Sequence, residues 1–306
     1  MHPFTLVLLL LPQSPAPAKS AAPGVSVETV SVEDVRVERD VLYRTVEDGA
    51  RREELRLDAY LPAGDGPHPA LLLVHGGAWM HGDKHDMGAL AEGFAREGYA
   101  CFAPRYRFAP AYRYPAQLAD VRYALQWVRS EAERFAIDPA RFAALGFSAG
   151  GHLVALLGVL DDARDAQASD PVLRQSSRPT CVVDYFGPAL LSRTKEHGFD
   201  TQPPPELFGD APDSAYAAAS PLNFVTKDDV PFLLVHGDAD ELVPLEHSRK
   251  MDEALRAVGV PSELVIVAGG GHGDFFRTQP GGEYWKRTES WLAEHLRSSA
   301  ATSSAR

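Results

Sequence analysis

Apolar runs and helical periods alternate along most of the chain. Two early segments, 35–44 and 54–61, alternate apolar and polar residues, as half-exposed antiparallel strands do. Six continuous apolar runs are typical of strands that are covered on both faces: 70–74, 99–103, 142–146, 181–185, 232–236 and 264–267. Segments with helical spacing separate or follow them: 88–97, 115–135, 149–160, 245–258 and 283–297. This order predicts an α/β fold with an eight-stranded, mostly parallel sheet and helices on both faces.

One connection breaks this rhythm. Residues 187–227 are rich in Pro, Ala, Ser and Asp, and they are too many for an ordinary connection. We therefore expect a small cap here, with short helices of its own. The remaining division predicts a flexible segment at 19–30, one domain at 31–298 and a disordered tail at 299–306.

The first residues resemble a secretory leader. Phe4 to Leu11 form an apolar run, which is far shorter than the ~20 residues of a membrane-spanning helix. The stretch Pro15–Ala18 then offers an Ala-x-Ala cleavage site. This predicts a signal peptide at 1–18, a secreted or periplasmic protein and no stable membrane anchor. A ragged N-terminus on a cytoplasmic protein is the alternative.

Composition and net charge limit the class of protein and the kinds of binding partner. The 306 residues are 45% hydrophobic and 24% charged, as in an ordinary globular protein. A net charge of −12 speaks against nucleic acid as a partner. Cys101 and Cys181 each lie in an apolar run, which favours two separate buried thiols over a disulfide. The oligomeric state is left open.

The strongest chemical motif is the pentapeptide Gly146–Gly150, which reads Gly-Phe-Ser-Ala-Gly. It follows the run 142–146 and opens the helical period 149–160. A sharp turn between strand and helix exposes the serine hydroxyl and crowds the neighbours two residues away, where only glycine fits. The context favours a catalytic motif over a coincidence, and it predicts Ser148 as the nucleophile.

A second glycine-rich motif, His75–Trp79, follows the run 70–74. Ester cleavage passes through an oxyanion that needs preorganised N–H donors, and glycine leaves backbone N–H groups unobstructed. We therefore predict an oxyanion hole from the backbone of Gly76, Gly77 and Ala149. The alternative is a tight glycine turn without a chemical role.

The base and the acid should follow the serine in chain order, each after a later strand. His272 lies on a glycine-rich loop after 264–267, and it is predicted to take the serine proton. Asp240 is favoured as the acid that orients the base, and Asp238 is the alternative, more suited to holding its loop. Three further histidines beside the motifs are interpreted as hydrogen-bonding scaffold: His75, His152 and His236.

No metal or other cofactor is predicted. His81 and His85 have a spacing that a metal could use, but the sequence offers no third ligand nearby. A solvated or structural role is therefore favoured for both.

Together these residues resemble the esterase/lipase branch of the α/β-hydrolase superfamily. Within that branch, the chain is most similar to the bifunctional feruloyl and acetyl-xylan esterase-like group, near the hormone-sensitive-lipase family. The matching stretches are 75–79 with 82–84, 106–110, 114–117 with 120, 146–152, 184–188, 236–244 and 269–273. The resemblance implies an α/β-hydrolase fold, cofactor-free hydrolysis of carboxylic esters, and the acid and base roles for Asp240 and His272.

Two departures favour the first group over the hormone-sensitive-lipase family. Phe147 precedes the serine where the lipase relatives usually carry Asp, and Ala78 ends the oxyanion motif where some relatives carry a third Gly. Neither departure shows that the substrate is xylan.

The sequence therefore predicts a serine carboxylesterase for a small-molecule or carbohydrate ester, with short acyl chains favoured because no long apolar lid is evident. We expect Trp79 and Tyr106 to contribute to substrate binding together with the cap. Two alternatives remain. One is an amide-bond hydrolase of the prolyl-oligopeptidase or arylformamidase type, and the other is a non-catalytic binding protein on a hydrolase scaffold.

Overall fold

The computed structural model describes residues 29–32, 35–49, 51–194 and 197–296. The predicted signal peptide at 1–18 and the predicted tail at 299–306 lie outside the described residues, and both stay predictions. Within the described part, no helix is long and apolar enough to cross a membrane.

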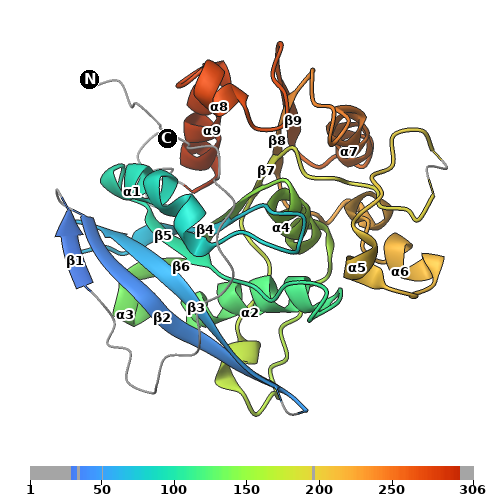
Figure 1. Cartoon of the computed structure of the whole chain (residues 1–306). Helices are drawn as coiled ribbons and strands as arrows, with labels where there is room; N and C mark the ends of the chain where they lie inside the picture. Colours follow the sequence, from blue (N-terminus) through green and yellow to red (C-terminus); the bar gives the residue numbers. More distant parts are fainter. Residues whose placement is uncertain (1–28, 33–34, 50, 195–196, 297–306) are drawn as a thin grey trace.

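One twisted sheet runs through the described part of the chain (Figure 1). Its strands lie in the order β1-β2-β3-β5-β4-β6-β7-β8-β9. The first four strands in that order pair antiparallel, and the pairs from β5 onward are parallel. The strand bounds are β1 (Thr29–Val32), β2 (Val35–Asp48), β3 (Arg51–Pro62), β4 (His68–Val74), β5 (Ala100–Pro104), β6 (Ile137–Phe147), β7 (Val182–Tyr185), β8 (Phe232–Gly237) and β9 (Ser262–Val267).

The sheet has nine strands rather than the predicted eight. The additional strand is β1, whose first two residues fall in the segment predicted as flexible. Thr29 pairs with Glu38 and Val32 with Val35, so β1 covers the outer edge of β2. The strand was not predicted because its alternation of polar and apolar residues covers only four positions and directly follows an Ala/Pro/Ser-rich stretch.

Helices cover both faces of the sheet, as predicted. Their apolar sides form two cores: α2, α4 and α7 contribute Leu125, Leu156 and Leu255 to one, and α1 and α9 contribute Phe94 and Leu292 to the other. The bounds are α1 (Gly88–Arg96), α2 (Ala116–Ser130), α3 (Ala132–Phe135), α4 (Ala149–Val159), α7 (Glu246–Ala257), α8 (Phe275–Thr278) and α9 (Glu283–His295), with short 3₁₀ turns η1 (Lys84–Met87) and η2 (Pro171–Arg174). The predicted helix 115–135 is interrupted at Glu131, between α2 and α3.

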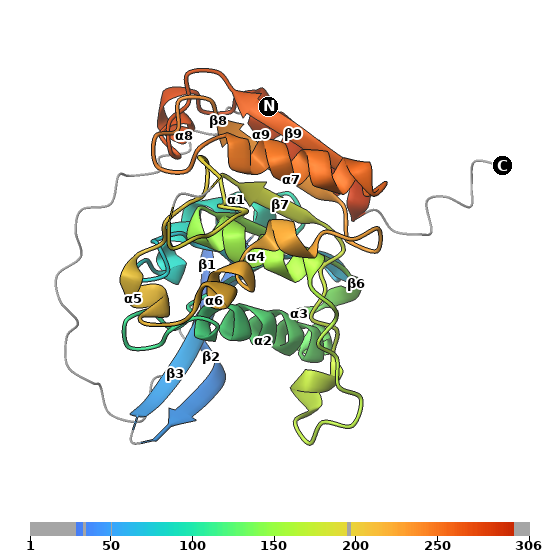
Figure 2. The same ribbon diagram turned by 90° about the vertical axis from the view of Figure 1, so that its right-hand side faces the viewer.

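The segment 187–227 forms a small cap with the short helices α5 (Pro205–Phe208) and α6 (Asp213–Ala217) and the turn η3 (Pro221–Phe224). The turn η3 packs against α4, and Figure 2 shows α5 and α6 away from the C-terminal elements β9 and α9. The backbone N–H of Tyr114 donates to the carbonyl of Leu207 and docks the cap on the segment before α2, whereas the N–H of Leu222 donates to the carbonyl of Ala189 and joins the two ends of the cap.

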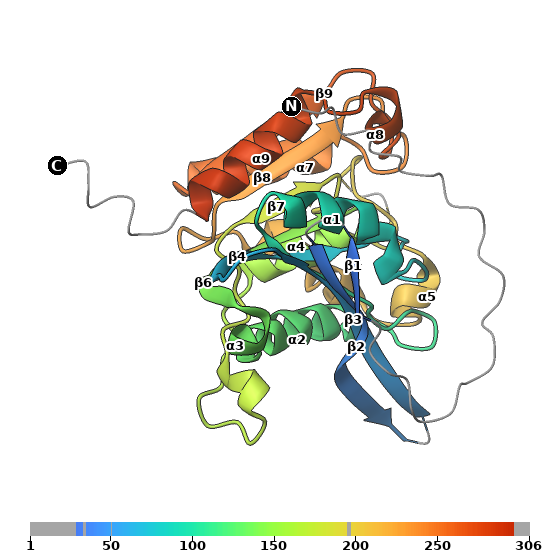
Figure 3. The same cartoon turned by 90° about the vertical axis from the view of Figure 1, so that its left-hand side faces the viewer.

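Toward the edge of the sheet that is farthest from β9, β2 and β3 form a long hairpin. Its tip extends beyond the other strands (Figure 3). Cys101 lies on β5 and Cys181 directly before β7, and both are buried free thiols. The prediction of two separate thiols is therefore confirmed.

Candidate active site

Ser148 lies on the turn between β6 and α4, with φ 53° and ψ −118°. Its backbone N–H donates to the carbonyl of Tyr185 at 2.9 Å. A Cβ on Gly146 would lie 2.3 Å from the carbonyl oxygen of Gly150, and one on Gly150 would lie 2.2 Å from that of Val74. The turn therefore requires both glycines, for the steric reason that the motif predicts.

His272 joins Ser148 to Asp240. Its Nε2 lies 2.9 Å from the hydroxyl oxygen of Ser148, and its Nδ1 lies 2.7 Å from Oδ2 of Asp240. Because a carboxylate only accepts, Nδ1 carries the proton and Nε2 accepts from the serine hydroxyl. The structure thus brings together three predicted residues from the ends of β6, β8 and β9.

Three hydrogen bonds and one longer contact surround the carboxylate of Asp240. Oδ1 accepts from the backbone N–H groups of Leu242 and Val243, both at 2.9 Å. Oδ2 accepts from His272, and Nε2 of the fully buried His236 lies 3.3 Å away. Burial alone would raise the pKa of Asp240, but the hydrogen bonds from His236 and His272 hold it well below its usual range. The lowered pKa keeps the carboxylate of Asp240 ionised beside the imidazole of His272.

Asp238, the alternative acid, has a different contact. Its Oδ1 accepts from the backbone N–H of Gly269 at 2.7 Å, which ties the loop after β8 to the loop after β9. This is the loop-holding contact expected of it, and Asp240 is the aspartate that contacts His272.

The loop after β4 approaches the serine closely. A Cβ on Gly76 would lie 3.0 Å from the carbonyl oxygen of Phe147 and 3.3 Å from Cβ of Ser148. The next three residues, Gly77–Trp79, have left-handed φ values of 111°, 49° and 61°. The backbone of the loop therefore lies against Ser148, and a side chain at position 76 would hinder this close approach.

The structure buries both Trp79 and Tyr106, and their contribution to substrate binding stays a prediction. The indole N–H of Trp79 donates to Nδ1 of His152 at 3.2 Å, and Nε2–H of His152 donates to the carbonyl of Ala219 at 2.6 Å. Burial lowers the pKa of His152 to about 4, which keeps the ring neutral and able to accept. Buried polar tips need partners, and these tips find them inside the protein.

Tyr106 holds the glycine loop His75–Trp79 by its carbonyl groups. Its hydroxyl donates to the carbonyls of His75 and Gly76, at 3.2 and 3.3 Å, and Nδ1–H of His75 donates to the same Gly76 oxygen at 2.7 Å. In a trans peptide the C=O and N–H groups point in opposite directions. Contacts that hold the Gly76 carbonyl therefore also orient the N–H of Gly77.

Phe186, which no motif predicted as a site residue, contacts the imidazole of His272. This residue has φ 45°, and its ring centroid lies 4.7 Å from that of His272 in an edge-on arrangement. Phe186 thereby restricts the plane of the imidazole. Phe186 lies in the matching stretch 184–188, but its place directly after the apolar run 181–185 makes it look like a continuation of the strand.

The fold and this arrangement define a protein of the α/β-hydrolase class, as predicted. The chain belongs to the BD-FAE family, which it matches over residues 57–255. The expected resemblance to α/β-hydrolase esterases is thereby confirmed.

Curated relatives and solved structures agree with this assignment. Esterase LipC of Mycobacterium tuberculosis is 33% identical over 70% of this chain and 56% of its own length. The chain spans about half the length of the curated relatives it matches. An acetyl ester-xyloside bifunctional hydrolase from Caldicellulosiruptor lactoaceticus superposes with a TM-score of 0.74, at 32% identity, over 81% of this chain and 91% of that chain. The butyrate-bound esterase Est2 of Thermogutta terrifontis gives 0.70, at 26% identity, over 88% and 94%.

Proposed function

We propose that this protein is a serine carboxylesterase in which Ser148 is the nucleophile, His272 the base and Asp240 the residue that orients the base. The observation that carries the proposal is the continuous hydrogen-bonded series of these three side chains, at 2.9 and 2.7 Å. That series lies beside a glycine loop and the first turn of α4, which is the arrangement that acyl transfer needs.

In the first half of the reaction, the hydroxyl oxygen of Ser148 bonds to the ester carbonyl carbon while its proton passes to Nε2 of His272. The carbonyl oxygen becomes an oxyanion, which accepts from the backbone N–H groups of Gly76, Gly77 and Ala149. Ala149 opens α4, so the partial positive charge of a helix N-terminus adds to this stabilisation.

The tetrahedral intermediate then expels the alcohol, which takes the proton from Nε2 of His272 and leaves an acyl ester on Ser148. A water molecule repeats the sequence: it loses a proton to the same nitrogen, bonds to the acyl carbon and releases the carboxylic acid as Ser148 regains its proton. Asp240 stays ionised throughout and stabilises the transient imidazolium.

The substrates we propose are esters of short acyl chains. The support is the expectation from the sequence, together with the relatives named above: one is an acetyl ester-xyloside hydrolase, and another was solved with butyrate bound. Acetylated sugars therefore belong among the first compounds to examine.

A substrate panel tests this function. It contains p-nitrophenyl esters from acetate to laurate, a feruloyl ester, an acetylated sugar and an aminoacyl anilide, each with Ser148→Ala and His272→Ala as controls. We expect acetate or butyrate to be hydrolysed fastest, and each variant to lose on the order of 10⁴-fold in kcat. Faster cleavage of the anilide would favour the amide hydrolase instead. No labelling of wild-type Ser148 by a fluorophosphonate would favour the binding protein, and rates that rise beyond about ten carbons would contradict the short-chain preference.

A further inference from the structure

The loop between β4 and η1 has a backbone that needs external support. Ala78 and Trp79 both have left-handed φ values, which are unfavourable for residues with a side chain. Such conformations persist when surrounding contacts hold them in place. The buried contact of Trp79 with His152 is one support, and it lies in the middle of the loop.

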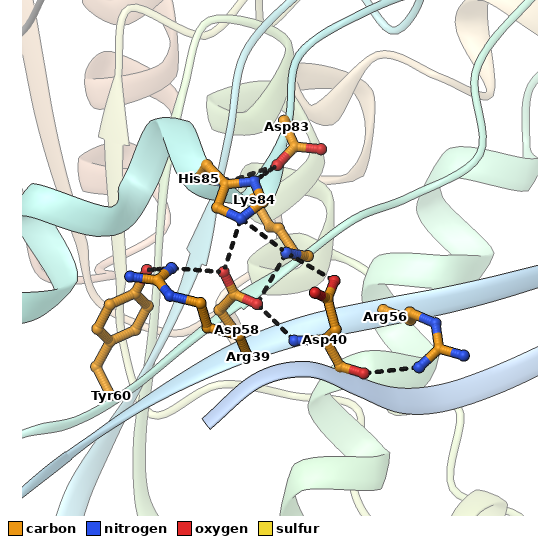
Figure 4. Close-up of polar contacts among 8 residues, drawn as sticks. All are labelled: Arg39, Asp40, Arg56, Asp58, Tyr60, Asp83, Lys84 and His85. Carbon is orange, nitrogen blue, oxygen red and sulfur yellow. Dashed lines mark hydrogen bonds and ion pairs between the residues drawn. The ribbon is translucent and has the colours of Figure 1, made fainter. Parts of the chain in front are cut away.

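The end of the loop has a second support, Lys84 (Figure 4). Its side chain is only 4% exposed, and its ammonium group lies 2.9 Å from Oδ1 of Asp58 and 3.1 Å from Oδ1 of Asp40. Its third neighbour is Nε2 of His85, at 3.2 Å. A buried ammonium group is tolerated only with such partners, so the contacts fix the position of Lys84.

The carboxylate of Asp58 is the centre of this cluster. It is fully buried on β3, where Oδ1 also accepts from the backbone N–H of Asp40 at 2.9 Å, and Oδ2 accepts from Arg39 at 3.3 Å. The β2–β3 register shifts between Glu38 and Val41, so that Arg39 and Asp40 together face Asp58. This bulge aims two donors of β2 at one carboxylate.

Hydrogen bonds of Asp83 and Asp86 stabilise the turn η1, which carries Lys84. Asp83 accepts from the backbone N–H of His85 at 2.9 Å and donates its own N–H to Asp86 at 2.8 Å, which closes a capping box. The imidazole of His85 also contacts the Asp83 carboxylate. A displacement of Lys84 would therefore move residues 83–86 together.

Gly82 links this turn to the peptide groups near the serine. It has φ 107°, and a Cβ on it would lie 2.5 Å from Nδ1 of His75 and 2.7 Å from the carbonyl oxygen of Gly76. The backbone of Gly82 thus packs against the carbonyl side of the peptide unit whose N–H belongs to Gly77. Only one residue separates Gly82 from Lys84.

We propose that Lys84 is a positioning residue for ester hydrolysis. Its ion pair with Asp58 ties the end of the loop to the antiparallel strands β2 and β3, and this keeps the N–H groups of Gly76 and Gly77 aimed at the developing oxyanion. The inference rests on the proposed function, and it extends the site to a cluster that the glycine motif alone does not include.

The test compares Lys84→Met with the wild-type enzyme in two measurements: kcat and KM for p-nitrophenyl acetate, and Ki for a trifluoromethyl ketone, which forms an oxyanionic adduct with the serine. We expect kcat to fall on the order of 10- to 100-fold, Ki to rise by a similar factor, and KM to change less than about threefold. A loss of the transition-state contact moves kcat and Ki together, whereas a general loss of folded protein moves neither KM nor Ki.

Arg129→Met is the matched control. Arg129 is a buried cation on α2 that donates to the backbone carbonyls of Pro139, Ser176 and Arg178, at 2.6–3.1 Å. Its loss should lower Tm while leaving kcat and Ki within about threefold of the wild-type values. Equal losses of kcat in this control would overturn the proposal, as would wild-type kcat in Lys84→Met.

The double variant Lys84→Met/Asp58→Asn covers the case in which the single variant does not fold. It removes the buried carboxylate of Asp58 together with the ammonium group, and the carboxylate of Asp40 that remains is on a side chain that is 44% exposed, so a main cause of misfolding is removed. The same loss of kcat at unchanged KM is expected, and wild-type kcat would overturn the proposal. The Ser148→Ala result is independent of these variants, so failure of the proposed function is distinguished from failure of this inference.

Discussion

The two halves of the active site are held by different kinds of contact. The half that carries Ser148 and the loop before η1 lies on the central strands β4 and β6, and buried side chains such as Trp79 and Lys84 support it. The half that carries the base lies on loops after β8 and β9, near the edge of the sheet. There, exposed carboxylates hold the backbone, since Gly269 donates to Asp238 and Gly271 to Asp274.

The two halves are held differently because they have different roles in the proposed reaction. Backbone N–H groups stabilise an oxyanion only if they already point at it, because turning a peptide unit during the reaction would cost the energy that they provide. In the proposed mechanism the imidazole instead moves a proton between Ser148 and the leaving group, and the side chain of His272 is 21% exposed. A fixed carboxylate at Asp240 and the ring of Phe186 are enough to orient it.

The largest expected effect separates the two aspartates of the base half. Asp240→Asn should lose on the order of 10³-fold in kcat, because an amide no longer fixes the tautomer of His272 or stabilises the imidazolium. Asp238→Asn keeps an oxygen acceptor for Gly269 and should stay within a few-fold of the wild-type kcat. Steady-state kinetics on p-nitrophenyl acetate measure both, and equal losses in the two variants would mean that the acid has been assigned to the wrong residue.

A pair of glycine variants compares the halves directly. In Gly77→Ala, the new Cβ would lie 2.0 Å from the carbonyl oxygen of His81, so the loop must move and kcat should fall on the order of 10²-fold. Gly269 also has a left-handed φ, 68°, but no atom lies within 4 Å of a Cβ there. Gly269→Ala should therefore cost only about 1 kcal/mol of stability.

Urea denaturation and kcat, measured on both glycine variants, check this prediction. If Gly77→Ala retained the wild-type kcat, the glycine loop would not supply the oxyanion donors. If Gly269→Ala lost activity as strongly as Gly77→Ala, the contrast between the halves would be wrong.

The smallest effect on activity is expected at Asp184, a fully buried carboxyl on β7. Burial raises its pKa to about 6, although the N–H of Gly187 donates to it. Because this lies above the unfolded value near 4, the group stabilises the fold below about pH 4, and that stability is lost as the pH rises through 6. Relative to wild type, Asp184→Asn should gain roughly 2–3 kcal/mol between pH 4 and pH 7. Unfolding curves at several pH values measure this gain, and a pH-independent difference would contradict it.

Individual elements and residues differ in how well they could be predicted from the sequence. The strands β2 to β9 were predicted because buried and half-buried strands leave different apolar patterns, whereas β1 was too short to stand out. Ser148, His272 and Asp240 were found from motif context and chain order. The internal partners of Trp79 and Tyr106 could not be predicted, because aromatic residues beside a motif have the same appearance in the sequence whatever they contact.

The sequence by itself determined the class of fold and the three chemical groups, because both follow from local patterns: the period of apolar residues and the glycines around a strained turn. Only the tertiary structure revealed the partners of the loop between β4 and η1. Lys84 and Asp58 are 26 residues apart, and although Lys84 lies in a stretch that matches the family, nothing in the sequence pairs it with Asp58. Their burial and pairing depend on a bulge in β2 and on the neighbouring position of β3, and long-range packing of this kind leaves no periodic signal along the chain.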